Sequence, residues 1–218
     1  MLEQAKPLIK RLNSSLELLE HLIDTDNGDT GEPYHWIEPE PCIGPLSTDE
    51  GVDQLVKQGI PNRELIVGAI CKHYGFLREN LLRNINVCTT EGLYQIINTG
   101  HVYYSSQELV HPMSIEIIVE MLEILRNRIA DGKVKLLFTN PSKITVPKKT
   151  LISINRKMGI NLIMHDSSGS DFRAVCFSEE SINEAFVDFV ESIEDSGLVY
   201  NETDSLATLD SIINELHK

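Results

Sequence analysis

The sequence predicts a protein of the α+β or α/β class, in which an N-terminal helical region precedes a mixed β-sheet covered by helices. Two observations lead to this prediction. Glycines and capping residues divide residues 47–98 into short helical segments. From residue 101 onward, apolar strand-like runs alternate with amphipathic helical stretches, as is typical of a parallel or mixed sheet. We therefore expect a helical domain at 1–100 and an α/β domain at 101–218.

Residues 3–24 form the first predicted helix. Its apolar side chains recur at alternating steps of four and three residues, which places them on one stripe of a helix. The same repeat suits the seam of a coiled coil, so packing on its own domain and dimerisation both stay open. If the chain forms a homo-oligomer, this helix is the expected contact. The stripe consists of Ala5, Ile9, Leu12, Leu16, Leu19 and Ile23.

Residues 24–46 are expected to form a loop, because three glycines and four prolines interrupt regular structure. Its aspartates do not follow the order of a calcium-binding EF-hand, since Gly28 precedes Asp29. The aromatic run Tyr34–Trp36 is expected to anchor the loop on the core. The four cysteines form no CxxC pair, so we expect no metal site and free thiols.

The elements that follow are bounded by capping residues and glycines. Ser47 and Asn62 are candidate N-caps, and Gly59, Gly75 and Gly100 are candidate helix ends. The predicted helices lie at about 47–58, 63–74, 77–85, 91–98, 114–132, 147–158, 178–195 and 204–216. The predicted strands lie at about 102–104, 133–138, 160–164 and 172–177.

Several classes of protein are excluded by missing patterns. No apolar run is long enough to span a membrane, and the N-terminus lacks the apolar core of a signal peptide. With free thiols, this predicts a cytoplasmic protein with no membrane partner. The usual phosphate-loop, dinucleotide, hydrolase and zinc-protease motifs are missing as well, so we expect no cofactor and favour a non-enzymatic protein.

A DNA-binding hypothesis comes from residues 57–83, which hold five basic and two acidic side chains inside an acidic protein. The segment LVKQGIPNRELIVGAI resembles the start of a helix-turn-helix motif, although no Ser or Thr caps a second helix after Gly75. Arginine, lysine and asparagine are side chains that contact phosphates and bases. The candidate DNA contacts are Arg63, Lys72, Arg78, Asn80 and Arg83.

Residues 92–195 resemble, in their layout, the phospholipase-D-like sensor domains attached to helix-turn-helix regulators. The resemblance lies in the run GLYQIINTGHVYYSSQELV, a long helix, GKVKLLFTNP, MGINLIMHD and the Arg-led strand DFRAVCF. The HxKxxxxD signature of the enzymes in that superfamily is missing, because Asp166 follows His165 and no lysine follows two residues on. The resemblance implies a domain that senses or binds rather than cuts.

Charge is divided along the chain into blocks of opposite sign. Residues 126–157 hold nine basic side chains and one acidic side chain, whereas the chain as a whole has a net charge of −14. The block is expected either to bind a small anionic ligand or to dock onto the acidic C-terminal helices at 179–218. The candidate ligand contacts are Lys133, Lys135, Lys143, Lys148, Lys149 and His165.

These patterns favour a regulatory protein, with transcription regulation through DNA and a ligand-sensing α/β domain as the first hypothesis. The alternatives are an interaction or adaptor module whose acidic ends bind a basic partner, and an enzyme that acts on a phosphorylated small molecule at Lys143–Lys149 and His165.

Overall fold

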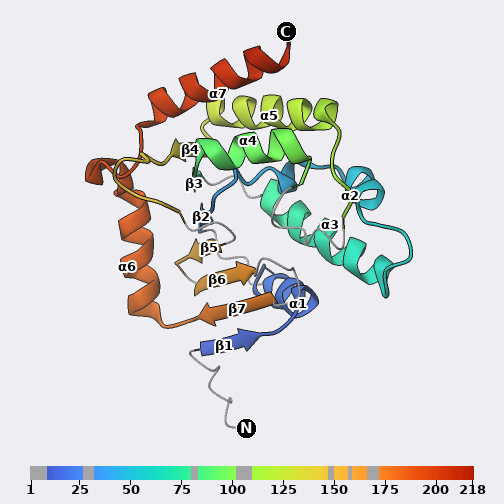
Figure 1. The fold of residues 1–218 in the computed structure, drawn as a ribbon. Helices are drawn as coiled ribbons and strands as arrows, with labels where there is room; N and C mark the ends of the chain where they lie inside the picture. Colours follow the sequence, from blue (N-terminus) through green and yellow to red (C-terminus); the bar gives the residue numbers. More distant parts are fainter. Residues whose placement is uncertain are drawn as a thin grey trace.

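The computed structural model describes residues 9–26, 32–79, 83–101, 110–146, 150–156, 159–165 and 172–218. Its framework is a seven-stranded mixed sheet with the strand order β1-β7-β6-β5-β2-β3-β4 (Figure 1). The predicted class, a mixed sheet covered by helices, is confirmed. The strands are β1 (Ile9–Leu12), β2 (His35–Ile37), β3 (Asn84–Cys88), β4 (Val134–Phe138), β5 (Thr150–Asn155), β6 (Gly159–His165) and β7 (Phe172–Phe177).

Helices follow the strands in an α/β order along the middle of the chain. Two 3₁₀ helices, η1 (Gly44–Leu46) and η2 (Ile193–Ser196), add single turns. The α-helices are α1 (Ser15–Asp26), α2 (Asp49–Leu55), α3 (Arg63–Glu79), α4 (Thr90–Thr99), α5 (Ile115–Ala130), α6 (Glu180–Glu191) and α7 (Glu202–Leu216).

The sheet has a parallel half and an antiparallel half. Strands β2, β3 and β4 are parallel, and the crossovers between them carry α2 to α5. In this half, Trp36 is in register with Asn86, and Asn86 with Leu136, so the three side chains share one face. The antiparallel half contains β5, β6, β7 and β1, with β5 paired to β2 at the junction.

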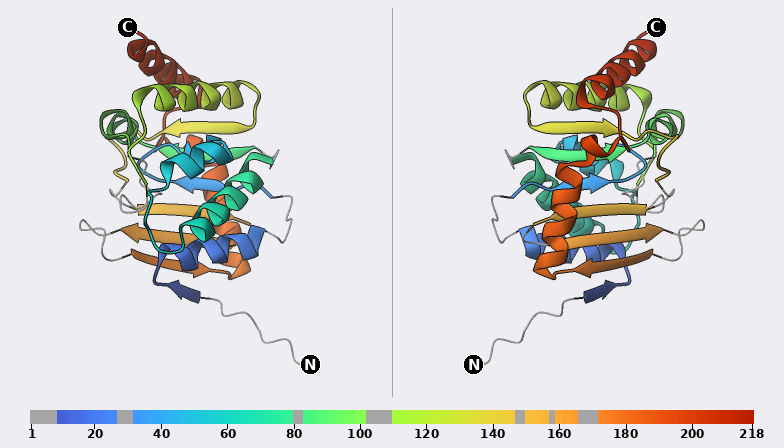
Figure 2. Two further views of the ribbon diagram at one scale, coloured as in Figure 1. Left: turned by 90° about the vertical axis from the view of Figure 1, so that its right-hand side faces the viewer. Right: turned by 90° about the vertical axis from the view of Figure 1, so that its left-hand side faces the viewer.

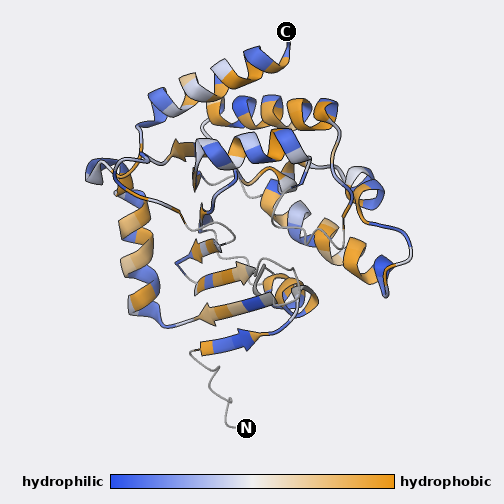
Figure 3. Ribbon diagram, viewed as in Figure 1, coloured by the Kyte–Doolittle hydropathy of each residue, from blue (hydrophilic) through white to orange (hydrophobic). Residues whose placement is uncertain are grey.

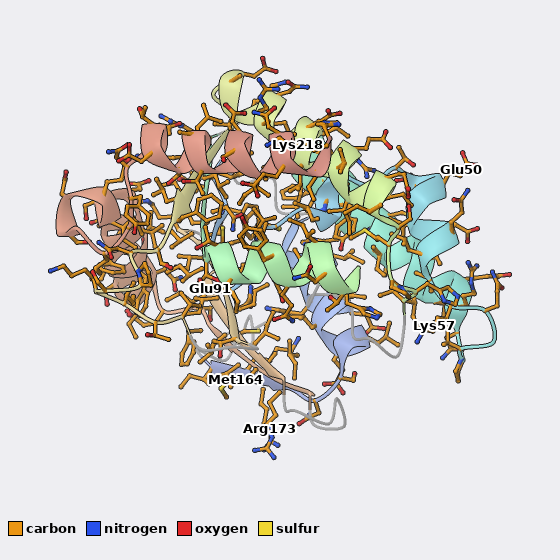
Figure 4. The ribbon with its side chains drawn as sticks, turned by 45° about the horizontal axis from the view of Figure 1, so that its top comes forward. Glu50, Lys57, Glu91, Met164, Arg173 and Lys218 are labelled. Atoms are coloured by element: carbon orange, nitrogen blue, oxygen red, sulfur yellow. The ribbon has the colours of Figure 1, made fainter. Side chains whose placement is uncertain are left out.

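Helices cover both faces of the sheet. The two side views show α1 and α3 in front of one face and α6 in front of the other, while α5 and α7 lie beside the β4 edge (Figure 2). Hydrophobic residues run along the strands of the antiparallel half and along α6 (Figure 3). At the far end of this half, Met164 and Arg173 are cross-strand neighbours that project outward (Figure 4).

The prediction of a helix over residues 3–24 is wrong for residues 9–14. Residues 9–12 form β1, which pairs with β7, and the helix begins only at Ser15; residues 1–8 lie outside the described part. The helix starts there because Ser14 Oγ accepts a hydrogen bond from the Glu17 N–H, and Glu17 Oε2 accepts one from the Asn13 N–H. These reciprocal hydrogen bonds cap the start of the helix. The apolar repeat extends across this start, so it predicted a longer helix.

The two helices predicted at 63–74 and 77–85 are also corrected. One continuous helix, α3, passes through Gly75 and ends at Glu79. The strand β3 begins at Asn84, where pairing with β2 and β4 on both sides buries its five residues. Packing of α3 therefore outweighs the low helix propensity of Gly75. The two-helix motif expected over 59–83 is not formed.

The segment 147–158 was expected to be a helix, but Thr150–Asn155 forms β5 between β2 and β6. Alternating apolar residues and β-branched side chains suit this central strand. Within the loop predicted at 24–46, residues 35–37 form β2, and Tyr34–Trp36 are buried as expected. The strand predicted at 102–104 lies outside the described residues.

Most of the remaining boundaries agree with the prediction to within a few residues. Gly100 and Gly132 have positive φ angles directly after α4 and α5, as helix-terminating glycines do, whereas α2 ends at Leu55 and not at Gly59. The four cysteines are free thiols. In the described part of the chain, no helix is both long enough and apolar enough to cross a bilayer. The domain boundary near residue 100 stays a prediction, although strands from both sides of it pair in one sheet.

Candidate ligand-binding site

The loop that follows β2 is held across the end of β3 and the first turn of α4. The Glu38 N–H donates to the Val87 carbonyl at 3.0 Å, and Thr89 Oγ1 donates to the Pro39 carbonyl at 2.9 Å. Gly92 is required at this crossing, because a Cβ atom there would lie 1.9 Å from the Pro39 carbonyl oxygen. The loop is therefore positioned by backbone contacts at the carboxyl end of parallel strands, where open α/β sheets bind ligands.

Two buried asparagines on β3 form a polar stripe under this loop. Asn84 Oδ1 accepts a hydrogen bond from the Tyr34 N–H at 3.0 Å, and Asn86 Oδ1 accepts one from the Cys42 N–H at 2.9 Å. Asn86 Nδ2 also donates to Glu38 Oε1 at 3.2 Å. Because β-strand side chains alternate, Asn84 and Asn86 point to the same face as Trp36 and Glu38. Sequence reasoning missed these residues, although asparagine at alternate positions of a buried strand is a visible signal.

One pocket on this face, which we call the acidic pocket, has about 380 Å³ of space that is not filled by atoms, part of it open to solvent. Glu38 and Glu40 line it and are only 5% and 2% exposed. Burial, and then the neighbouring Glu40, raise the pKa of Glu38 well above its ordinary value. The remaining lining residues are Trp36, Pro41, Cys42, Ile43, Gly44, Pro45, His73, Tyr74 and Leu77.

Two further titratable groups of the acidic pocket, Cys42 and Tyr74, have raised pKa values. Burial is the main factor that raises the pKa of Cys42 well above its usual range and that of Tyr74 as well. Glu38 forms no ion pair with the described residues, and its hydrogen bonds come from the neutral side chains of Asn86 and Cys42. No group of three metal-binding side chains able to hold an ion was found in the described ranges.

A further pocket, which we call the basic pocket, has about 410 Å³ of space that is not filled by atoms, part of it open to solvent. It is lined by Arg128 on α5 together with Asn84 and Asn86. The Nε atom of Arg128 is buried and has no hydrogen-bond partner among the described residues. Burial lowers the pKa of Arg128, and the charge of Asp131 opposes this shift. The rest of its lining consists of Trp36, Cys42, Pro45, Leu46, Leu77, Leu125 and Val134.

The two pockets adjoin each other, because they share four lining residues: Trp36, Cys42, Pro45 and Leu77. One side of this shared wall carries buried carboxyl groups, and the other carries a half-buried guanidinium. The arrangement therefore places buried carboxyl groups and a guanidinium group at a mainly apolar wall, in the way that small-molecule sites place a few polar groups in an apolar cleft.

The residues predicted to contact DNA lie mainly in contacts within the chain. Arg63 pairs with Asp53 at 2.8 Å, and Arg78 pairs with Asp49 at 2.6 Å. Arg83 pairs with Glu202 on α7. Lys72 is exposed on α3, and Asn80 lies outside the described residues. Three of the arginine charges are thus partly neutralised by acids of the same chain.

The residues predicted to bind an anion are spread over the sheet. Lys133 lies next to the start of β4, and His165 lies at the end of β6. The two strands run in the same direction, so these residues are at opposite ends of the sheet. The strands are also four positions apart in the sheet, which is about 19 Å at ordinary strand spacing. Lys143 is exposed, and Lys148, Lys149 and the His165 side chain lie outside what is described. The described members are therefore not brought into a single site.

The basic block instead makes ion pairs with the acidic C-terminal helices. Arg126 pairs with Asp210 at 2.7 Å, and Lys135 pairs with Glu194. Arg156 pairs with Asp188 at 3.0 Å and approaches Glu191 at 3.5 Å. The docking alternative of the sequence analysis thus accounts for these cations, at about 0–1 kcal/mol for each exposed pair.

Comparison with known proteins adds little to this geometry. No protein-family model matches the chain, and no curated protein sequence matches it either. Among solved structures, the chain is similar to TrmBL2, an archaeal chromatin protein described with a novel mode of DNA binding. The identity is 8%, the TM-score is 0.42, and the match covers 92% of this chain and 56% of that protein. The chain spans only about half of TrmBL2, and a likeness at this level identifies neither a family nor a function.

Proposed function

We propose that this protein is a regulatory protein that binds a small molecule between the parallel half of its sheet and helices α3 and α5. The observation that carries the proposal is the pair of adjoining pockets that hold buried Glu38 on one side and half-buried Arg128 on the other. Burying charged or polar side chains without ionic partners costs free energy, so their retention at a cleft is typical of a functional site.

A thermal-shift screen of the full chain against a library of small polar metabolites tests this proposal, because a ligand that binds only the folded state raises its Tm. Hits should lose their effect in Glu38→Gln or Arg128→Met. The matched controls are Glu184→Gln, an exposed position on α6, and Arg126→Met, which lies two residues from Arg128 on α5. The proposal fails if no compound shifts the melting temperature, or if the control variants abolish the shifts equally.

Transcription regulation through DNA contact is the output that the sequence predicts for such a protein. With Arg63, Arg78 and Arg83 already paired inside the chain, we propose Lys72 as the contact to test first. Fluorescence anisotropy with a labelled duplex should show binding that weakens between about 50 and 200 mM salt. Lys72→Ala should weaken it, and Lys143→Ala is the control. If the affinity for the duplex does not change with salt concentration, or if no binding is seen at low salt, a role in DNA contact is excluded.

A further inference from the structure

We infer that two copies of this chain associate through the sheet face that carries α6, with α6 of each copy lying on the uncovered strands of the other. This face is opposite to the pockets. Trp36 lines both pockets, whereas its chain neighbour His35 points the other way and places Nε2 3.8 Å from Glu191 Oε1 on α6. A contact between copies on this face is therefore separate from the proposed ligand site.

The strands β5, β6 and β7 carry apolar side chains on both faces. On the face toward α1, Leu151 and Ile163 are buried in one apolar cluster. On the face toward α6, residues paired in register form the row Ile152, Leu162 and Val175, and all three are only half-buried. An antiparallel sheet with one face in water alternates apolar and polar residues, so this pattern is typical of strands that are covered on both sides.

Helix α6 covers only one end of this face. Ile154 and Ile160, which are paired near the β5–β6 turn, are buried against Val187 and Val190 of α6. The right-hand view of Figure 2 shows the strands extending past α6, with no further described helix in front of them. The face is therefore stepped, because α6 stands above the sheet at one end and the strands are uncovered at the other.

The flank of α6 that faces the uncovered strands is apolar. Ile182, Phe186 and Phe189 recur at steps of four and three residues and are 42%, 42% and 43% exposed. Arg156, on the β5–β6 turn, pairs with Asp188, so the acidic flank of α6 faces that turn. Phe186 lies two residues before Asp188, which is about 200° around a helix, so the apolar flank faces the other way, toward the uncovered strands.

Exposed apolar side chains of the described chain are concentrated on this face. Ten large hydrophobic side chains are exposed in the described part, and five of them lie here: Ile9, Met164, Ile182, Phe186 and Phe189. A contiguous exposed apolar surface marks an interaction site more often than scattered apolar residues do. Ile9 also belongs to the stripe within residues 3–24 for which the sequence predicts a contact between copies.

The charges at the borders of this face make it complementary to itself. Arg11 and Arg173 are exposed, and they point to this face because they are in register with Val175 and Met164. The acidic flank of α6 lies at the opposite border. A two-fold axis parallel to α6 brings the acidic border of each copy to the basic border of the other, and α6 of each copy onto the uncovered strands of the other. A second copy therefore matches this face in both shape and charge.

Sedimentation equilibrium of the full chain tests this contact. The parent protein should be a dimer at about 10–100 μM, and Phe186→Glu should weaken dimerisation at least about tenfold. The matched control is Leu65→Glu on α3, because Leu65 is 67% exposed and α3 lies in front of the opposite face of the sheet. This control should dimerise as the parent does.

Charge variants test how the two copies are oriented. Arg173→Glu should weaken dimerisation more than Arg173→Met does, because it brings a like charge to the acidic border of the other copy. Equal effects of these two variants would reject the two-fold arrangement. Circular dichroism melts verify folding, and Ile182→Glu replaces Phe186→Glu if the latter does not fold. A parent that is monomeric at about 100 μM, or a dimer that Phe186→Glu and Leu65→Glu leave equally intact, overturns the inference.

Discussion

Glu38 and Glu194 are the same residue type in two regions of one sheet, and their pKa values move in opposite directions. Burial raises the pKa of Glu38, and the adjacent Glu40 raises it further. Burial also works to raise the pKa of Glu194, but hydrogen bonds from Lys135 and from the Glu202 N–H together lower it below its ordinary value. The surroundings of Glu38 thus favour the protonated form of its carboxyl group, and those of Glu194 favour the ionised form.

The opposite pKa shifts of Glu38 and Glu194 indicate that the two regions contribute differently to the stability of the fold. Glu194 belongs to the ion pairs that hold the acidic C-terminal helices to the basic block, where both partners keep some access to water. Glu38 is placed by the backbone of its loop, and no cation among the described residues pairs with it to offset its burial. A carboxyl group that the fold does not use for its own stability is the better candidate for binding something else.

The largest effect is expected from Gly92→Ala, which removes the backbone arrangement that positions Glu38. The new methyl group would lie 1.9 Å from the Pro39 carbonyl oxygen, so either the loop or α4 must move. We expect a loss of about 3 kcal/mol in the free energy of unfolding, measured by urea titration.

The matched control is Gly68→Ala, on the exposed face of α3, where an added Cβ meets no atom within 4 Å. Helix propensity predicts a gain of about 0.5–1 kcal/mol there. Equal effects of the two substitutions would show that the Gly92 contact does not hold the loop.

A smaller effect, with a clear pH dependence, is expected from Glu38→Gln. Because the folded-state pKa of Glu38 is raised, its contribution to stability is full below the ordinary pKa of a carboxyl group and is lost as the pH rises through the folded-state value. The variant cannot ionise, so its stability relative to the parent should rise by about 1–2 kcal/mol as the pH increases above the ordinary pKa of a carboxyl group, with little difference below that pKa.

Glu194→Gln should show the opposite sign. Its folded-state pKa is lowered, so the parent gains stability above the ordinary pKa of a carboxyl group, and that gain is lost as the pH falls through the folded-state value. The variant should therefore be the less stable one at neutral pH. Thermal melts across this pH range compare the two positions directly, and parallel pH profiles would remove the contrast between the two regions.

The smallest effect is expected from Lys135→Met, which breaks the pair with Glu194. The two side chains are 15% and 27% exposed, so we expect a loss of only about 0.5–1 kcal/mol. The loss should shrink in about 1 M salt, because partly exposed charges are screened. Lys143→Met is the control for loss of an exposed charge. A loss that persists unchanged at high salt would mean that packing of the lysine stem, and not the ion pair, is the source of stability.

Local sequence signals predicted much of the fold but little of the site. Amphipathic repeats and terminating glycines located α4, α5 and α7, and apolar runs located β4, β6 and β7. The same reasoning missed β3 and β5, because both are short central strands whose structure depends on partners far away in sequence. It also placed DNA contacts at Arg78 and Arg83 without being able to see that Asp49 and Glu202 lie beside them.

The sequence by itself determined the class of the fold and the separation of charge into acidic and basic blocks, since periodicity, caps and charge are local properties. Only the tertiary structure decided which groups these charged side chains contact. The basic block pairs with the C-terminal helices, whereas Glu38 and Arg128 line adjoining pockets. The physical reason is that burial and pairing depend on which segments meet in space. Glu38, Asn86 and Arg128 are far apart along the chain, and only the pairing of β2 with β3 and the packing of α5 bring them to one face.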